Sequence, residues 1–101
     1  MASQKAGSES ATMKFPFGQV VITIGCKAHM DSLQANPHHF LQRHISGDWG
    51  ILDEEDRQRN DEAVVHGSRI LSRYQLSDGE NIYIITEHDR SYTTIMLCDE
   101  Y

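Results

Sequence analysis

One cysteine and several histidines lie close together in the first half of the chain and could bind a metal ion. The set comprises Cys26, His29, His38, His39 and His44. Thiolate and imidazole groups are the ligands that zinc prefers in a tetrahedral site. The spacing matches no standard zinc finger, however, and adjacent histidines on a helix point in different directions. We therefore expect no metal and no other cofactor.

A second polar group, Glu87-His88-Asp89-Arg90, combines an acid, a base and a guanidinium, as a hydrolytic site would. Tight turns collect the same residue types for backbone reasons. We expect Asp89 to accept hydrogen bonds from turn amides and Arg90 to pair with a carboxylate such as Glu87. The sequence has no nucleophile elbow, no glycine-rich phosphate loop and no paired carboxylates set in a pocket. These observations predict that the protein is not an enzyme.

A third group consists of six carboxylates between residues 53 and 62, with only Arg57 and Arg59 among them: Asp53, Glu54, Glu55, Asp56, Asp61 and Glu62. Such a run usually forms a solvated helix face, because the positive end of the helix dipole favours acids in the first turn. The alternative is that the acids imitate a row of phosphates and block the groove of a DNA- or RNA-binding protein.

The charge of the whole chain bears on the choice of partner. The formal net charge is −6, and residues 51–101 hold 12 acidic and 5 basic groups, against 3 and 4 in residues 1–50. A half-chain of this charge repels a phosphate backbone, so direct binding of nucleic acid is disfavoured and a basic protein partner is favoured.

Two cysteines, Cys26 and Cys98, are too few for a disulfide scaffold and fit a reducing cytosol, although a single bridge would be allowed. No apolar run approaches the roughly 18 residues that cross a bilayer, and the N-terminus lacks the apolar centre of a signal peptide. We expect a cytoplasmic protein that does not contact a membrane.

The elements that must position these groups begin after a Ser/Ala/Gly-rich stretch, residues 1–14, which we expect to be a flexible leader to one domain, residues 15–101. Residues 20–24 are mostly β-branched and predict a buried strand that Gly25 closes. Residues 31–33 and 37–44 then predict two short helices or one broken helix around Asn36.

The turn at residues 46–50 contains Trp49, the only tryptophan, which either fills the edge of the core or stands exposed. A helix is predicted from Asp53, its N-cap, to Val65, with Gly67 as its terminator. The apolar stripe of this helix is thin, so we expect most of its surface to be solvated.

The C-terminal third alternates with period two and predicts a meander of three strands, residues 70–76, 81–87 and 92–98. Asp78-Gly79 is a strong hairpin signal. Placing these two residues at the centre of a tight turn pairs Tyr74 with Tyr83 and Arg73 with Ile84. A similar turn at Asp89-Arg90 pairs Tyr83 with Met96 and Ile84 with Ile95.

This register gives the predicted sheet two apolar faces. The aliphatic face contains Leu71, Ile82, Ile84, Ile95 and Leu97, and the tyrosine-rich face contains Ile70, Tyr74, Leu76, Tyr83, Ile85, Tyr92 and Met96. The helices would cover the first face. Aromatic and methionine side chains are enriched where a sheet meets a partner, so the second face predicts protein binding or self-association, unless the N-terminal elements bury it.

Several motifs resemble a family of small bacterial proteins carried on plasmids, integrative elements and phages. The likeness covers about residues 45–101 and lies in Gly47-Asp48-Trp49-Gly50, Asp53-Glu54-Glu55-Asp56 with Asn60, Gly67, Arg69-Ile70-Leu71-Ser72, Ile84-Ile85-Thr86-Glu87, Asp89-Arg90-Ser91, Thr93-Thr94-Ile95 and Glu100-Tyr101. The resemblance implies cargo of a mobile element, and small acidic proteins of such elements are often inhibitors of host defence, including anti-restriction and anti-CRISPR proteins.

These observations predict an α+β domain in which a three- or four-stranded antiparallel sheet carries two or three helices on one face. The expected function is non-enzymatic inhibition of a host defence protein through its basic nucleic-acid-binding surface. A homodimeric regulatory or accessory module of the mobile element is the alternative. The expected partner-binding residues are Asp48, Trp49, Asp53, Glu54, Glu55, Asp56, Tyr74, Tyr83, Tyr92 and Arg90.

Overall fold

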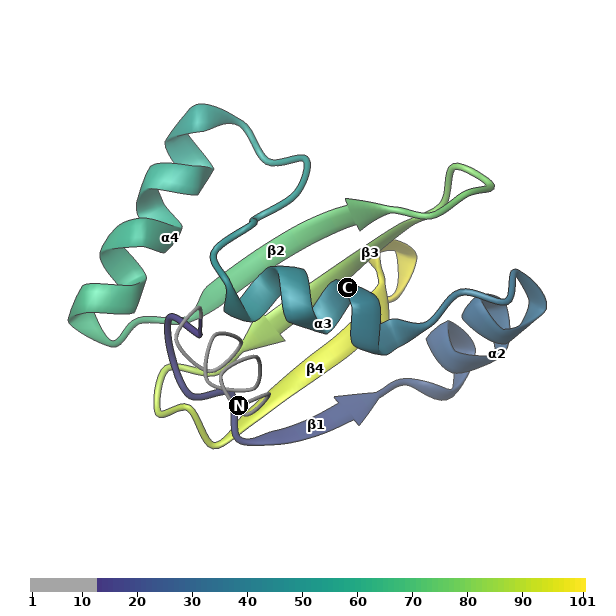
Figure 1. The fold of residues 1–101 in the computed structure, drawn as a ribbon, viewed down its shortest axis with the longest axis horizontal. Coiled ribbons are helices and arrows are strands. Elements are labelled where there is room, and N and C mark those ends of the chain that lie inside the picture. The colour runs from purple at the N-terminus through teal and green to yellow at the C-terminus, as the bar shows by residue number, and fades with distance from the viewer. Residues whose placement is uncertain (1–12) are drawn as a thin grey trace, which may run out of the picture.

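The computed structural model describes residues 13–101 and has an α+β fold, as the sequence predicts. The predicted leader falls almost entirely outside the described residues. The sheet has the strand order β1-β4-β3-β2 (Figure 1). The elements in chain order are β1 (Gln19–Ile22), α2 (Ile24–Ser32), α3 (Pro37–Ile45), α4 (Glu54–His66), β2 (Ile70–Gln75), β3 (Asn81–Thr86), β4 (Tyr92–Leu97) and a 3-10 turn (Cys98–Glu100).

Strands β2, β3 and β4 form the predicted antiparallel meander, but β1 runs parallel to β4, so the sheet is mixed. A parallel neighbour needs a long crossover, and three helices and two strands separate β1 from β4 in the chain. The prediction of a buried first strand is wrong. β1 lies at the edge of the sheet, and Val20 and Val21 are 40% and 43% exposed.

The first two helices are set by their N-caps. Thr23 Oγ1 accepts a hydrogen bond from the Cys26 amide at 3.1 Å, so α2 begins at Ile24, seven residues before the predicted helical stretch. The predicted break at Asn36 is confirmed, because its side chain accepts from the His38 amide and Pro37 occupies the first turn of α3.

The predicted helix after residue 53 is confirmed as α4. Asp53 Oδ1 accepts from the Asp56 amide at 2.8 Å, and Gly67 ends the helix in the left-handed conformation, with φ of 80°. Only Asn60 and Ala63 of this helix are buried, so α4 is as solvated as its thin apolar stripe predicts.

The β2–β3 hairpin differs from the predicted register by one residue. Arg73 pairs with Tyr83 and Tyr74 with Ile82, because the loop has three residues rather than two. Leu76 donates to the Glu80 carbonyl across the loop, and Gly79 supplies the positive φ, 94°, that such loops need. The predicted register of β3 on β4 is confirmed: Tyr83 pairs with Met96 and Ile84 with Ile95.

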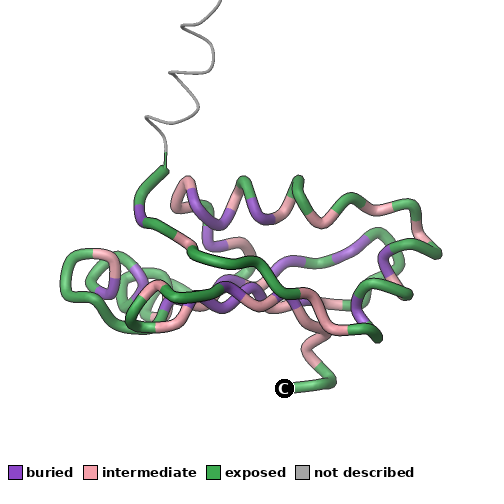
Figure 2. Tube along the Cα trace, turned by 90° about the horizontal axis from the view of Figure 1, so that it is seen from below, coloured by how far each residue is buried: buried purple, intermediate pink, exposed green. Residues whose placement is uncertain are grey.

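The shifted register moves several side chains of β2 to the opposite face. The face toward α3 carries Ile70, Ser72, Tyr74, Ile82, Ile84, Thr86, Thr93 and Ile95, each 1% exposed or less. Ile70 and Tyr74 therefore belong to the core, and Leu71 lies on the other face, contrary to prediction. Figure 2 shows α3 and the segment that precedes β1 on one side of the sheet, while the C-terminal end projects from the other side.

Candidate protein-binding surface

A chain of hydrogen bonds crosses the core beneath α3 and holds that helix on the sheet. His44 is completely buried, and its ring nitrogens lie 2.6 Å from Ser72 Oγ and 2.9 Å from Thr86 Oγ1. Thr86 Oγ1 is in turn 2.7 Å from Thr93 Oγ1, which donates to the Phe17 carbonyl. These hydrogen bonds thus link α3, three strands and the segment before β1.

The last acceptor sets the direction of every bond in this chain. Because Thr93 donates its proton to a carbonyl, it accepts from Thr86, and Thr86 must accept from His44 Nε2–H. His44 Nδ1 then accepts from the Ser72 hydroxyl. The imidazole is neutral, since burial lowers the pKa of His44 to about 3. A substrate cannot reach this Ser–His pair, as both side chains are completely buried.

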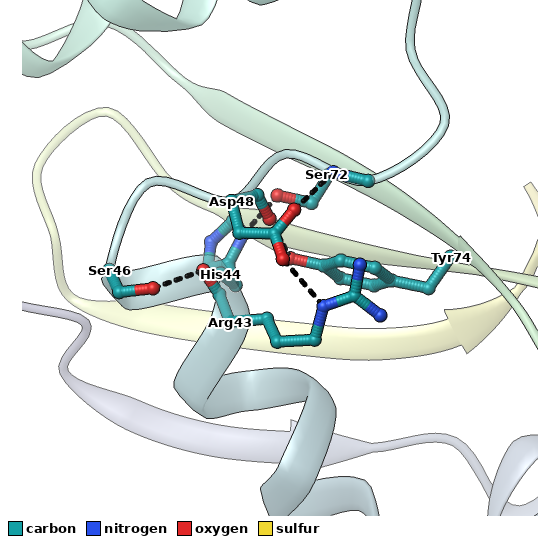
Figure 3. A network of polar contacts seen from close by, with 7 residues as sticks. Arg43, His44, Ser46, Asp48, Ser72 and Tyr74 are labelled. Atoms are coloured by element: carbon teal, nitrogen blue, oxygen red, sulfur yellow. Dashed lines mark hydrogen bonds and ion pairs between the residues drawn. The ribbon is translucent and has the colours of Figure 1, made fainter.

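Next to these hydrogen-bonded side chains, Asp48 joins the end of α3 to β2 (Figure 3). Arg43 Nε donates to the Asp48 carboxylate at 2.7 Å and the guanidinium lies 4.6 Å from the centre of the Tyr74 ring. The Tyr74 hydroxyl donates to the Asp48 carbonyl at 2.6 Å. The hydrogen bond from Arg43 lowers the pKa of Asp48, and burial raises the pKa of Tyr74. Tyr74 is therefore a core residue, and the expectation that it anchors a partner is wrong.

Trp49 fills the edge of the core, the first of the two positions predicted for it. It is 4% exposed, stacks on Phe15 with ring centres 6.2 Å apart, and meets the His44 ring edge-on at 6.0 Å. Its indole Nε1–H donates to Asp61 of α4 at 3.0 Å. Trp49 thus attaches α4 to the core, and too little of its ring is exposed for it to be a partner's anchor.

Two further polar side chains fix α4 at the edge of β2. The Asn60 amide donates to the Leu71 carbonyl at 2.7 Å and accepts from the Leu71 N–H at 3.2 Å, as a neighbouring strand would. Arg90 donates to the Ala63 carbonyl in the last turn of α4 and to the carbonyls of Ser68 and Glu87. These contacts give a helix with few apolar contacts a defined orientation.

Arg90 is consequently a structural residue. Its partners are backbone carbonyls, so the expected pairing with the Glu87 carboxylate is wrong, whereas Asp89 accepts from the Ser91 amide as predicted. Arg90 has a φ of 62° and its guanidinium lies 5.7 Å from the centre of the Phe15 ring. The sequence signal was its position in the turn, which gave no indication that it reaches α4.

The outward side of α4 carries the predicted acids. Glu54 and Glu55 are exposed, and Asp56 is half-buried. Arg59 contacts Glu55 at 3.7 Å and Asp56 at 2.8 Å. Both ion pairs are solvated and contribute little to stability. An open groove of about 590 Å³ lies between the first turns of α4 and Trp49, with Glu54 and Asp61 in its lining.

The sheet face opposite α3 retains part of the predicted tyrosine cluster. Tyr83 is half-buried and meets the Tyr101 ring at 5.3 Å, and Tyr92 is 43% exposed. Leu71, Thr94 and Met96 lie on the same face and are half-buried. Arg73 also lies on this face, which is less apolar than the sequence predicts because β2 contributes an arginine where a tyrosine was expected.

The candidate metal ligands do not come together. Cys26 is buried with its Sγ 3.7 Å from Met30 Sδ, and burial raises its pKa to about 11. His29 bonds Asp78 on the β2–β3 loop, while His44 lies in the core. Within residues 13–101, no three His, Cys, Asp or Glu side chains are placed to hold a metal ion, and Cys26 and Cys98 are both free.

No known protein family, curated protein or solved structure matches this chain. Among the helices of residues 13–101, none has the length and apolar character needed to cross a membrane.

Proposed function

We propose that this protein is a non-enzymatic inhibitor from a bacterial mobile element, and that it binds the basic nucleic-acid-binding surface of a host defence protein, either a CRISPR effector or a restriction enzyme. The observation that carries the proposal is the acidic helix α4. It is almost wholly solvated, yet it is held to the core by Trp49, Asn60 and Arg90.

A helix fixed in this way suits electrostatic competition with nucleic acid. Residues 53–66 hold six carboxylates and two arginines, and 13 helical residues span about 20 Å, comparable to several phosphates along a strand. Binding loses less conformational entropy when the charged surface is already oriented. Complementary charge also accelerates encounter with a basic partner, and the effect weakens with salt.

The test uses purified probes, a CRISPR effector complex and a restriction endonuclease, and measures their DNA binding with and without the protein. The variant Glu54→Gln/Glu55→Gln/Glu62→Gln removes three charges from α4 and leaves the Asp53 cap and the Trp49–Asp61 bond in place. We expect at least about tenfold weaker inhibition, since surface charges across such interfaces contribute of order 1 kcal/mol each.

The matched control is Glu80→Gln/Glu87→Gln/Asp99→Asn, which changes net charge equally but lies off α4. It should inhibit as strongly as the unmodified protein. Equal loss in both variants would show that only total charge matters, and absence of inhibition with every probe would reject the proposed function.

The second candidate is a homodimeric accessory module of the mobile element. The observation that favours it is the sheet face opposite α3, where Val21 and Tyr92 are each 43% exposed and Tyr101 is 64% exposed. Apolar and aromatic side chains grouped in this way are typical of interaction surfaces. The molar mass in solution distinguishes this candidate from a monomeric inhibitor.

A further inference from the structure

We infer that two copies of this chain associate through the outer edge of β1, with the two strands antiparallel about a two-fold axis at Val21. The inference does not depend on the acidic helix, which lies at the opposite edge of the sheet (Figure 1). It deepens the second candidate function by naming the surface through which the copies meet.

The backbone of β1 offers unfilled hydrogen-bonding groups. Gln19 donates to the Ser91 carbonyl and Thr23 to the Ile95 carbonyl, so the odd-numbered residues of this segment face β4. Successive residues of a strand direct their N–H and C=O groups to opposite edges. The N–H and C=O groups of Val20 and Ile22 therefore face away from β4. No residue within 13–101 bonds these four groups.

The other edge of the sheet is built differently. In β2 the outward groups of Leu71 are bonded by the Asn60 side chain. Those of Arg73 are bonded by the backbone of Trp49 and Ile51. The chain therefore bonds the outward groups of Leu71 and Arg73 on one edge, and leaves those of Val20 and Ile22 on the other edge without a partner in the described residues. Proteins that stay monomeric commonly protect such an edge with a charge, a proline or a bulge, and Gln19–Ile22 contains none of these.

The absence of charged side chains along this edge allows a second copy to be the occupant. Each chain carries a net charge of −6, so two copies repel one another except where the contact is neutral. Residues 15–26 contain no Asp, Glu, Lys or Arg, and β1 lies at the centre of this stretch. Exposed apolar side chains follow the same edge: Val20 is 40%, Val21 43% and Ile24 90% exposed.

The alternation of groups fixes the register. Since Val20 and Ile22 both present N–H and C=O outward, antiparallel pairing bonds Val20 to Ile22 of the second copy, and the reverse, giving four hydrogen bonds around Val21. The two Val21 side chains then form a closely spaced pair on the sheet face opposite α3.

The test measures the molar mass of the full chain by light scattering across a concentration series. The unmodified protein should show twice the mass of one chain. Val21→Lys and Val21→Glu each place like charges face to face across the axis, and each should weaken the dimer about tenfold or more. An equimolar mixture of the two variants should restore a dimer, because the charges are then opposite. The control, Val65→Lys on α4, replaces another exposed valine and should leave the dimer intact.

Amide hydrogen exchange and one further variant separate the alternatives. In the dimer, the amides of Val20 and Ile22 should be protected, and the Val21 variants should lose that protection. A dimer that Tyr83→Ser abolishes, and that the mixed Val21 variants do not restore, would mean association through the tyrosine face and would overturn the β1 interface while keeping the second candidate function. A monomer at all concentrations, with or without those amides protected, would overturn both.

Discussion

Burial of His44 makes the stability of this protein sensitive to mild acid. The pKa of the ring is lowered from its ordinary value near 6.5 to about 3 by burial, and its two nitrogens are committed to Ser72 and Thr86. The folded state therefore binds fewer protons than the unfolded state when the pH falls below the unfolded pKa. The contribution of neutral His44 to the free energy of unfolding is fully present above about pH 6.5 and decreases steadily toward pH 3.

The size of the effect follows from linkage. At pH 5, about 1.5 units below the ordinary pKa of histidine, protonation of His44 lowers the free energy of the unfolded chain by about 2 kcal/mol. The folded chain, in which the ring stays neutral, does not gain this free energy. Domains of this size have unfolding free energies of order 5–10 kcal/mol, so the loss is a large share. Carboxylates act at lower pH: the pKa of Asp48 is lowered by Arg43 and that of Asp78 by the Glu80 amide, so both contribute until the pH falls below the usual carboxyl range.

Urea unfolding at pH 7, 6, 5.5 and 5 measures this loss, with far-UV circular dichroism and the fluorescence of Trp49 as probes. Trp49 reports on the same region, since its ring is 6.0 Å from that of His44. The variant His44→Gln keeps a donor and an acceptor at this position. It should be less stable at pH 7 and should lose most of the pH dependence between 6.5 and 5. In the folded protein, NMR should show that the His44 ring does not titrate in this range.

A flat stability profile from pH 7 to 5 in the unmodified protein would refute this reasoning. So would an equal slope in His44→Gln, because the slope would then belong to another group. A His44 ring that titrates near pH 6 in the folded state would show that the ring is solvated.

Four other substitutions test contacts that fix the fold. Gly50→Ala should cost about 3 kcal/mol or more in urea unfolding, because φ is 79° and a Cβ would lie 1.9 Å from the Arg73 carbonyl oxygen; Gly67→Ala, with a φ of 80° and no atom near its Cβ, should cost about 1 kcal/mol. Asn60→Ala removes two hydrogen bonds to β2 and should cost about 2 kcal/mol, with faster amide exchange throughout α4. Arg90→Gln should cost about 1–2 kcal/mol, and the faster exchange should be confined to the last turn of α4 and the β3–β4 loop.

Local signals in the sequence predicted the elements whose ends have specific chemistry. Asp53 and Gly67 bound α4, and Asn36 with Pro37 begins α3, because caps satisfy backbone groups through neighbouring residues. The start of α2 was missed because Thr23 reads as part of a β-branched run until its hydroxyl is seen to accept from the Cys26 amide.

The register of the first hairpin could not be read from Asp78-Gly79 alone. Two- and three-residue loops both accept this pair, and one residue of difference exchanges the two faces of β2. That exchange explains why Tyr74 was predicted on the binding surface and is found in the core. The parallel position of β1 depends on contacts with β4 across some 70 residues, which no local pattern reports.

The hydrogen-bonded core was also missed, because its members are far apart in the chain. The members are His44 on α3, Ser72 on β2, Thr86 on β3 and Thr93 on β4, and each alone is an ordinary polar residue. Asn60 gave no signal either, since a side chain that imitates a strand is recognised only beside the strand that it completes.

The Asn60 amide and the backbone of Trp49 and Ile51 bond the outward N–H and C=O groups of Leu71 and Arg73 on the β2 edge of the sheet. A sheet with two available edges can add molecules at both, as amyloid does, whereas in residues 13–101 the β2 edge is occupied at Leu71 and Arg73 and the β1 edge is not occupied at Val20 and Ile22. Addition of one molecule there uses up the growing end of both. If two copies pair through β1 as we infer, the contacts that occupy the β2 edge, among them the Asn60 side chain of α4, oppose growth beyond the pair.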